Sequence, residues 1–316
     1  MIYVDDFTHN NSNGYWLDAF RKYSSNVLRC DVIAKKPNQI LKEILINEPS
    51  HIHFGGSIKS EKRFPYKYIH DIRKNLPKTK ITFFYGDAYN LNYHRNIIRY
   101  IDKLFITHKP NDIKNKIEYI PCPTSLDSEN SENKKIYEVS FIGNNYSEYR
   151  LNDLKKISKI CDLTVIGNNW ENTGLKFKKS ISYKNFPEVV SKSKFCLGST
   201  LYVPCEWNSL CGVNTRLCHD KTCSKYEHKY GYFSNRVMNL CGCSGCVLHI
   251  NGKGMDEIFK NEFNILLFNS IEHLKDMIKT FNINDTTKIG KNAYNLSRNY
   301  TFEIIAKKII SGEKDD

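Results

Sequence analysis

Short apolar runs rich in β-branched residues alternate with segments of helical periodicity along the whole chain. Before residue 125 the apolar runs predict strands at Ile2–Asp6, Cys30–Ala34, Ser50–Gly55, Lys80–Tyr85, Lys103–Thr107 and Tyr119–Pro121. The helical patterns between these runs predict helices at Gly14–Ser25, Gln39–Asn47, Tyr66–Asn75 and Leu91–Tyr100. Strands that alternate with helices in this way predict a doubly wound parallel sheet.

A polar segment at residues 125–135, with one Leu as its apolar residue, is the predicted linker of the chain. Beyond it the predicted strands are Tyr137–Ile142, Asp162–Ile166, Lys194–Leu197, Gly245–Ile250 and Asn264–Phe268. The predicted helices are Leu151–Ile160, Phe186–Ser193 and Ser234–Leu240, with two more that start at Ile271 and at Thr286. We therefore predict two Rossmann-like α/β domains, 1–124 and 136–316, that face a cleft. The second has a Cys-rich insert at 201–230 and a closing C-terminal helix.

Composition narrows the class of protein. The chain has 316 residues, of which 40% are hydrophobic, so two packed cores are expected. No run of about 18 apolar residues exists, which excludes a membrane-spanning helix. The first residues predict a strand rather than a signal peptide. Eleven cysteines in such a chain indicate thiols or metal ligands rather than disulfides, and therefore the cytoplasm, or the host cytoplasm if the protein is viral.

Charge adds a hint about partners. Lys and Arg number 47 against 34 Asp and Glu, a net charge of +13, with an excess of 8 in residues 1–124 and of 5 in residues 125–316. Such a balance favours phosphate-bearing partners, whether nucleotide or nucleic acid. The abundance of Lys, Asn, Ile and Tyr is also typical of AT-rich codons, which would explain part of the excess.

Three strand ends or helix starts carry residues suited to a phosphate or a nucleoside. Gly143 and Asn144 follow a predicted strand, and Arg150 is near them, so that backbone N–H groups and a guanidinium would meet a phosphate. A second strand ends at Gly167, with two Asn and a Trp after it. Ser234 is a good helix N-cap, and Arg236 follows it. Each feature taken alone is also explained as a turn, a packing residue or a structural cap.

The order of these features along the chain is more specific than any one of them. Segment 231–248 carries an Arg and a Gly-rich turn before a strand. It is followed by Gly254-Met-Asp-Glu257-Ile-Phe259, by Asn261-Glu262, by an apolar strand with an acidic residue after it, and by a helix that starts near Tyr300-Thr301. With the upstream Phe-Ile-Gly and Val-Ile-Gly strand ends, residues 137–309 resemble bacterial and phage glycosyltransferases of the spore-maturation-protein-like group, among the glycosyl transferases of group 1.

The resemblance implies a GT-B architecture, with an N-terminal acceptor domain and a C-terminal nucleotide-sugar domain. It implies that Arg236 and the N–H groups from Ser234 and Asn235 onward meet the donor diphosphate, and that Gly143 and Asn144 line the donor loop. Glu262 would bind the ribose, and Glu257, in the Gly-x-x-Glu-x-Phe segment of the family pattern, would also belong to the donor site. Asn239 departs from the family pattern, because the family has a Glu that contacts the sugar there. Members of this type use a nucleotide sugar as co-substrate without a required cofactor or metal, and UDP-glucose is the first expectation.

The acceptor side rests on residues at strand ends of the first domain, where a base would sit beside the acceptor hydroxyl. Asp87 follows a buried-looking strand and is the first candidate; Asp6, next to Asp5, and His53, near Gly55 and Gly56, are the others. A turn or capping role is the alternative for the aspartates, and a structural role is the alternative for the histidine.

The Cys-rich insert offers a further possibility for chemistry. Cys205, Cys211, Cys218 and Cys223, with a His among them, would suit a structural zinc ion, although their spacing matches no common zinc module and free thiols are the favoured interpretation. Basic and aromatic residues also interleave in the insert, as in nucleic-acid contacts, or as in a solvated loop.

Two acceptor classes and one non-enzyme class stay open. The acceptor is a hydroxymethylated pyrimidine in double-stranded DNA, as the charge suggests, or it is a glycan, a protein or a small molecule. Alternatively, the chain is a catalytically degenerate GT-B binding protein, for which Asn239 is the best argument. The sequence leaves the oligomeric state open.

Overall fold

The computed structural model covers the whole chain. It describes residues 1–7, 11–55, 64–85, 96–107, 116–129, 134–145, 148–199, 234–252 and 254–312. These residues form two compact units. Unit 1 contains the described residues of 1–120 and of 302–316, and unit 2 contains those of 121–204 and 225–301. The predicted domains differ from this division because the last helix packs with unit 1.

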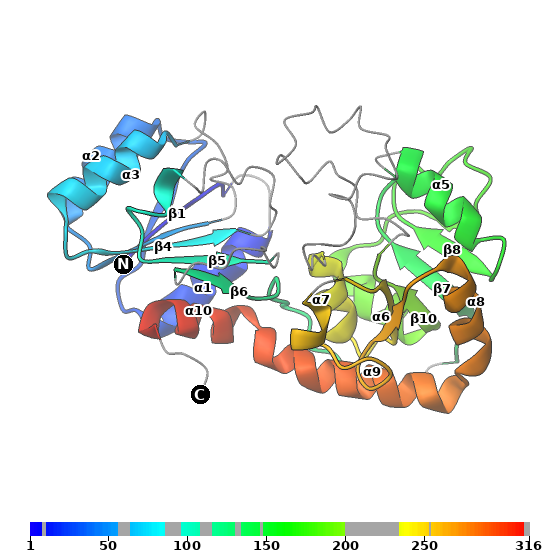
Figure 1. Cartoon of the computed structure of the whole chain (residues 1–316). Helices are drawn as coiled ribbons and strands as arrows, with labels where there is room; N and C mark the ends of the chain where they lie inside the picture. The colour runs from blue at the N-terminus through cyan, green and yellow to red at the C-terminus, as the bar shows by residue number, and fades with distance from the viewer. Residues whose placement is uncertain are drawn as a thin grey trace. The chain divides into compact units, whose positions relative to one another are not determined.

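Unit 1 is a six-stranded parallel sheet with helices on both faces (Figure 1). Its strands are β1 (Ile2–Asp5), β2 (Leu28–Asp31), β3 (His51–Phe54), β4 (Lys80–Tyr85), β5 (Lys103–Ile106) and β6 (Ile117–Tyr119). Its helices are α1 (Asn11–Tyr23), α2 (Pro37–Asn47), α3 (Tyr66–Asn75) and α10 (Phe302–Ser311). The strand order is β2-β1-β3-β4-β5-β6. Helices α2 and α3 cover one face, and α1 and α10 cover the other.

The core of unit 1 follows from the continuous apolar runs that its strands carry, as expected for strands buried on both faces. Alternate residues of β1 point to opposite faces. Val4 packs with Ile40 and Ile44 of α2, whereas Tyr3 contacts Phe20 of α1 with ring centroids 5.2 Å apart. The observed β2 begins two residues before the predicted strand, because Leu28 pairs with Ile2 at the start of the ladder.

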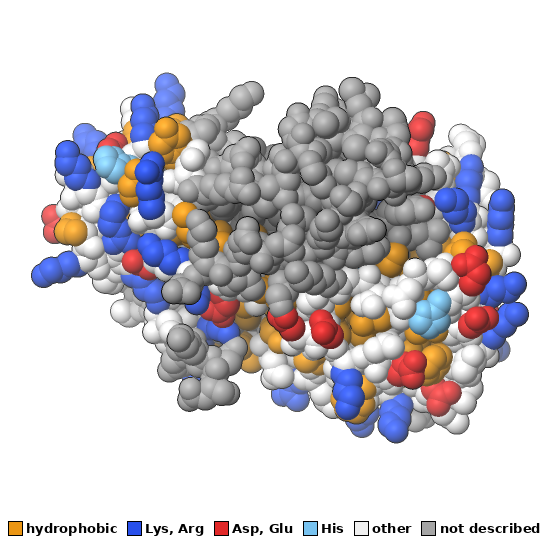
Figure 2. Space-filling model, viewed as in Figure 1, with side chains coloured by type: hydrophobic (Ala, Val, Ile, Leu, Met, Phe, Trp, Pro, Cys, Tyr) orange, Lys and Arg blue, Asp and Glu red, His pale blue; other side chains and the backbone are white. Residues whose placement is uncertain are grey.

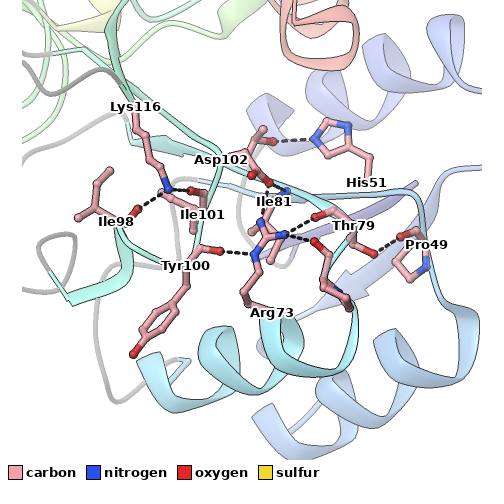
Figure 3. Close-up of polar contacts among 12 residues, drawn as sticks. Pro49, His51, Arg73, Thr79, Ile81, Ile98, Tyr100, Ile101, Asp102 and Lys116 are labelled. Carbon is pink, nitrogen blue, oxygen red and sulfur yellow. Dashed lines mark hydrogen bonds and ion pairs between the residues drawn. The ribbon is translucent and has the colours of Figure 1, made fainter.

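A polar network closes the amino edge of this sheet (Figure 3). Arg73 of α3 donates to the carbonyls of Tyr100, Pro77 and Thr79, and its Nη2 lies 2.6 Å from the Asp102 carboxylate. Asp102 also accepts the N–H of Ile81 at 2.7 Å. The network therefore satisfies loop carbonyls at the edge opposite the strand ends where doubly wound sheets bind ligands.

The last helix is anchored to unit 1 by packing and by a cap. Phe302 at its start lies edge-on to Trp16 of α1, with ring centroids 5.1 Å apart. At its end, the half-buried ammonium of Lys80 donates to the carbonyls of Ile309 and Ile310 at 2.8 and 2.9 Å. A cation at the C-terminal end of a helix is favourable because it meets unpaired carbonyls and the negative end of the helix dipole.

Unit 2 is a second six-stranded parallel sheet. Its strands are β7 (Tyr137–Ile142), β8 (Leu163–Ile166), β9 (Phe177–Lys178), β10 (Ser193–Leu197), β11 (Val247–Ile250) and β12 (Leu266–Phe268). Its α-helices are α5 (Glu148–Ile157), α6 (Phe186–Ser191), α7 (Asn235–Cys241), α8 (Ile271–Thr280) and α9 (Ile283–Ser297). Three short 3-10 turns are also present, η1 (Tyr183–Asn185), η5 (Met255–Glu257) and η6 (Arg298–Tyr300). The strand order is β12-β11-β10-β7-β8-β9.

The predicted linker is attached to unit 2 where the structure describes it. Thr124 pairs with Thr301 in an isolated bridge, and Ser128 donates its N–H to the carbonyl of Gly242 at 2.8 Å. Gly242 must be a glycine for this approach, since a Cβ there would lie 2.2 Å from the carbonyl oxygen of Leu126. Backbone groups and hydroxyls therefore hold residues 124–128 within unit 2, where apolar side chains are few.

The surface of unit 1 carries basic side chains over α2 and α3 (Figure 2). Lys42, Lys67 and Lys74 are exposed there. Over α8 of unit 2, both signs of charge are mixed. No helix among the described residues is long and apolar enough to cross a membrane.

Candidate donor-binding site

The strand order of unit 2 creates one point where connections leave the sheet in opposite directions. Strand β7 lies between β8 on one side and β10 on the other. Because all the strands are parallel, the carboxyl ends of β7 and β10 lie at the same edge. In doubly wound sheets a ligand binds in the crevice at such a switch point.

The loop after β7 is tied to the loop after β8. Gly143 donates its N–H to the carbonyl of Ile166 at 2.8 Å, which extends the ladder beyond the strands. The side-chain oxygen of Asn144 accepts the N–H of Asn168 at 2.9 Å. Asn145 donates its N–H to the carbonyl of Asn168 at 3.0 Å. The backbone of Asn168, one of the residues that the sequence suggested for a nucleoside, therefore fastens the two loops to each other.

Close packing explains the glycine at the end of β8. A Cβ on Gly167 would lie 2.4 Å from the carbonyl oxygen of Gly143, and its φ of +157° is one that other residues rarely adopt. The same carbonyl accepts the indole N–H of Trp170 at 2.8 Å. The Trp170 side chain is fully buried, so its position favours packing over contact with a base.

Two guanidinium groups meet the same ring at the end of β7. The guanidinium carbon of Arg236 lies 4.5 Å from the ring centroid of Phe141, and that of Arg150 lies 5.4 Å from it. Arg236 also donates to the carbonyl of Gly198, the residue after β10, at 3.2 Å. Arg236 therefore bridges the two strands that flank the switch point, with cation–π contacts to a buried ring.

Both arginines are fixed close to the backbone of the loop after β7. Arg150 donates to the carbonyl of Asn144 at 2.6 Å. A Cβ on Gly143 would lie 2.9 Å from a terminal nitrogen of Arg236, so a side chain at this position would displace the guanidinium. The sequence analysis expected Gly143, Asn144, Arg150 and Arg236 to contribute to donor binding, and the structure brings these four residues together.

Ser234 occupies the N-cap position of α7 but makes no side-chain capping bond. Its hydroxyl oxygen is buried and has no hydrogen-bond partner among the described residues. The capping function predicted for it is therefore not formed. A buried hydroxyl without a partner is costly. Asn235, the first residue of the helix, is exposed.

Asn239 lies on α7 one turn beyond Arg236, and its side-chain oxygen is held by two hydroxyl groups. Thr124 donates to it at 2.8 Å, and Tyr183 of η1 donates to it at 3.2 Å. Ser125 in turn lies 3.0 Å from the Tyr183 hydroxyl. These hydroxyl residues were missed by the sequence reasoning, because they lie 56 and more positions away from Asn239 and belong to no motif.

The two glutamates of the predicted site lie at opposite edges of the sheet. Glu257 is exposed in η5, after the carboxyl end of β11. Glu262 lies before β12, where its N–H donates to the carbonyl of Ile265 at 2.7 Å and its φ is +59°. The structure therefore separates Glu262 from Arg236, whereas Glu257 is at the edge that carries the arginines.

In unit 1 the corresponding switch point carries a carboxylate. Asp5 ends β1 and is buried; its carboxylate accepts the Tyr3 hydroxyl at 2.6 Å and the N–H of Asp6 at 2.8 Å. A Cβ on Gly55 would lie 1.8 Å from Asp5 Oδ2, so the residue after β3 must be glycine. The predicted candidate Asp6 is half-buried at this edge.

His53 is not accessible enough to act as the base that the sequence analysis considered. Its ring is fully buried among Tyr3, Trp16 and Phe20, and desolvation holds its pKa well below the ordinary value. Its Nδ1 lies 2.8 Å from the Thr82 hydroxyl. In this arrangement the ring has no exposed surface with which to meet an acceptor, so the structural interpretation of His53 is favoured. Asp87 lies outside the described residues.

The described cysteines are free thiols. Among the residues that the structure describes, no group of three or more His, Cys, Asp or Glu is arranged to hold a metal ion. Cys205, Cys211, Cys218 and Cys223, with the rest of the insert, lie outside the described residues. The zinc hypothesis for these four residues therefore stays a prediction.

Comparison with known proteins identifies the family. Residues 150–311 match the family of glycosyl transferase-like proteins. None of the curated proteins matches the chain. Among solved structures, Anabaena Alr3699/HepE in complex with UDP has a TM-score of 0.64 at 10% identity, with 98% of each chain covered.

Two further structures are similar over nearly their full length. The Thermosynechococcus elongatus sucrose-phosphate synthase has a TM-score of 0.64 at 10% identity, with 98% of this chain and 97% of that chain covered. A glycosyltransferase from Rickettsia africae ESF-5 has a TM-score of 0.66 at the same identity and coverage. The predicted α/β GT-B fold is confirmed, and because the family match spans half of the sequence, the chain belongs to the glycosyl transferase-like family.

Proposed function

We propose that the protein transfers a sugar from a nucleotide-diphosphate donor, UDP-glucose being the first candidate, to an acceptor hydroxyl. The observation that carries this proposal is the position of Arg236. It spans the switch point of unit 2 between β7 and β10, with Arg150 at the same aromatic ring. The similar HepE structures that contain UDP, UDP with glucose, or UDP-glucose support the choice of nucleotide.

The residues of the proposed site match the charge changes of such a transfer. The bond between the anomeric carbon and the β-phosphate oxygen breaks, a bond from that carbon to the acceptor oxygen forms, and the acceptor loses its proton. Negative charge therefore grows on the departing diphosphate, and two fixed guanidinium groups stabilise it without reorganisation. The buried Ser234 hydroxyl, which has no partner among the described residues, is a further group that a donor oxygen would satisfy.

Within this proposal Gly143, Asn144 and Gly167 shape the loops under the diphosphate, and Asn235 presents an N–H group at the start of α7. For the ribose, Glu257 is a better candidate than Glu262, because it lies at the carboxyl edge of the sheet. On the acceptor side, Asp6 stays a candidate base beside the buried Asp5.

The acceptor class stays open between a glycan, protein or small molecule and a hydroxymethylated pyrimidine in DNA. The basic surface over α2 and α3 gives affinity for any polyanion and therefore does not by itself favour a DNA acceptor. One assay distinguishes the two acceptor classes. The protein is incubated with nucleotide sugars, with and without hydroxymethylated DNA, and nucleotide release and nucleoside mass are followed.

The donor site is tested by calorimetric titration of UDP and UDP-glucose into the wild type and Arg236→Ala. We expect the variant to bind both ligands about 10- to 100-fold more weakly, since hydrogen bonds to charged groups contribute about 1.5–3 kcal/mol each. Arg21→Ala is the matched control, because Arg21 is an exposed arginine of unit 1 paired with Asp18. Equal affinity of Arg236→Ala and the wild type would remove this mechanism.

A further inference from the structure

The outer surface of helices α2 and α3 carries a group of exposed lysines. The two helices lie side by side on one face of the unit 1 sheet, with Ile44 of α2 and Ile72 of α3 buried beneath them (Figure 1). The exposed lysines on these helices and at their ends, which we call the basic face, are Lys36, Lys42, Lys67, Lys74 and Lys78. None of the five forms an ion pair within the described part of the chain.

Few carboxylates offset this positive charge. Glu43 of α2 is paired with Lys35, which leaves Asp71 of α3 and Glu48 at the end of α2. Helix α8 of unit 2 is different, because its four exposed charged side chains are balanced: Glu272, Lys275, Asp276 and Lys279. A lysine-rich composition alone would raise the charge of both helical surfaces, so the basic face is a local feature of unit 1.

An exposed isoleucine lies within the basic face. Ile46 of α2 is 70% exposed and follows Lys42 by four residues, so the two side chains lie on the same side of the helix. Tyr66, next to Lys67 at the start of α3, is 39% exposed. Figure 2 accordingly shows hydrophobic side chains between the lysines over these helices. The surface therefore offers positive charge and apolar area together.

This combination fits an anionic bilayer better than a nucleic acid. Nucleic acids are bound largely through arginine forks and stacked aromatic rings. The guanidinium of Arg73 on α3 is already bonded to Asp102 and to three backbone carbonyls. A phosphate backbone also has no apolar region for Ile46. In a bilayer, lysines meet the lipid phosphates and an apolar side chain enters the boundary between headgroups and acyl chains.

We propose that the basic face is a docking surface for an anionic lipid bilayer, with its lysines at the lipid phosphates and Ile46 among the headgroups. This interaction goes beyond the proposed function and does not depend on it. Helices α2 and α3 cover a face of the sheet, whereas the acceptor candidate Asp6 follows β1 at the carboxyl edge. Docking through the basic face therefore uses none of the residues assigned to sugar transfer.

Co-sedimentation of the full chain with vesicles tests the charge. Phosphatidylcholine vesicles are compared with vesicles that also contain about 30% phosphatidylglycerol, at about 0.1 M and about 1 M salt, where the Debye length is about 10 and about 3 Å. We expect binding to the anionic vesicles at the lower salt concentration alone.

Two triple variants with the same change of net charge locate the surface. Lys42→Glu/Lys67→Glu/Lys74→Glu should bind the anionic vesicles about 100-fold more weakly, since each lysine near such a surface contributes about fivefold. The matched control, Lys155→Glu/Lys275→Glu/Lys279→Glu, changes three exposed lysines of unit 2 and should bind about as tightly as the wild type. Urea denaturation checks that both variants are folded, and a Lys→Gln triple at residues 42, 67 and 74 gives the same test without added negative charge.

The apolar contribution has its own readout. Ile46→Ala should weaken binding about fivefold, because part of a buried apolar side chain is lost. This factor should be insensitive to moderate changes of salt, unlike the effect of the lysines. Ile136→Ala is the matched control, because Ile136 is 51% exposed in unit 2.

Two results would overturn the inference. One is equal binding of anionic vesicles by the two folded Lys→Glu triples. The other is a wild type that shifts a DNA duplex in a gel but does not sediment with anionic vesicles, which would make the basic face a nucleic-acid surface. A wild type that binds the vesicles but not UDP leaves the inference standing and removes the proposed function.

Discussion

In both sheets the first strand lies inside, with its successor on one side and a later strand on the other. Strand β1 lies between β2 and β3, and β7 lies between β8 and β10. The carboxyl end of β1 carries the buried Asp5 carboxylate, pressed against Gly55. The end of β7 carries Gly143 under the guanidinium of Arg236. Each sheet therefore has one switch point at which a ligand would bind. The side chains at that point decide whether the ligand meets a negative or a positive charge.

The buried polar groups of the two units differ as well. In unit 1, His51 and His53 both lie 2.8 Å from the Thr82 hydroxyl inside the sheet. The described part of unit 2 contains four buried thiols in β10, α7 and the turn before β11, at Cys196, Cys241, Cys243 and Cys246. Imidazoles gain a proton in acid and thiols lose one in alkali. Among its described residues unit 1 has one buried thiol as well, Cys30, so acid is expected to act mainly on unit 1 and alkali mainly on unit 2.

The largest expected effect comes from Gly55→Ala, which tests the contact at the end of β1. The new Cβ would lie 1.8 Å from Asp5 Oδ2, so the carboxylate must leave the Tyr3 hydroxyl. We expect the free energy of unfolding to fall by about 3 kcal/mol, as for overpacked cores. Urea denaturation measures it.

Gly14→Ala is the control for Gly55→Ala. Nothing lies within 4 Å of a Cβ at Gly14 in helix α1. This variant should be more stable than the wild type by about 0.5–1 kcal/mol, since alanine favours a helix. A Gly55→Ala protein as stable as the wild type would show that Asp5 is not held as the structure has it.

Gly167→Ala tests the end of β8 in unit 2. Its Cβ would lie 2.4 Å from the Gly143 carbonyl oxygen, so the loop after β7 must shift. We expect a loss of about 2 kcal/mol of stability and weaker UDP binding. Gly174→Ala has a left-handed backbone (φ +78°) with nothing within 4 Å of the Cβ, so it should lose stability by strain and keep its UDP affinity. If Gly167→Ala and the wild type bind UDP equally well, the loop after β7 does not take part in UDP binding.

The acid response should come from unit 1. Burial lowers the pKa of His51 to about 3 and that of His53 well below its ordinary value. Below pH 6.5 the unfolded chain therefore binds protons that the folded one does not. Stability falls by about 1.4 kcal/mol per pH unit for each histidine as the pH drops toward the folded pKa. Urea denaturation between pH 4 and 7 measures the slope; His53→Gln should reduce it, and exposed His70→Gln should not.

The alkaline response should come mainly from unit 2, with a contribution from Cys30 of unit 1. Burial raises the pKa of Cys196 to about 11 and that of Cys243 to about 12, and it raises those of Cys241 and Cys246 as well. Above about pH 9 the unfolded chain loses thiol protons that the folded one keeps, so stability falls as the pH rises. Cys196→Ala should reduce the slope of the free energy of unfolding against pH between pH 8 and 10.5. An unchanged slope would contradict a raised pKa of the buried Cys196 thiol.

The smallest effect is expected from Trp170→Phe, which removes the hydrogen bond from the indole to the Gly143 carbonyl. We expect a loss of about 1 kcal/mol beyond the packing loss, and a two- to threefold weaker affinity for UDP. Trp16→Phe in the core of unit 1 is the matched comparison. If both variants lower UDP affinity alike, the effect belongs to general stability rather than to the loop.

Sequence patterns predicted most of the strands because parallel strands buried on both faces are continuous apolar runs. Strands β4 and β7 have the predicted bounds. Strand β9 was not predicted, since Phe177–Lys178 is two residues long and exposed. Residues 125–135 were predicted as a linker from their polarity. Hydroxyl and backbone hydrogen bonds hold Thr124 and the first residues after it, and composition does not reveal these bonds.

By itself the sequence determined the alternation of strands and helices, the GT-B class and the glycosyl transferase-like family, because these depend on local periodicity and on motifs read in order. The tertiary structure decided which polar residues share a site. It buried His53, separated Glu262 from Arg236, and placed Thr124 and Tyr183 on Asn239. The physical reason is that hydrogen bonds and ring contacts between distant segments depend on strand order and helix direction, which residue spacing along the chain does not encode.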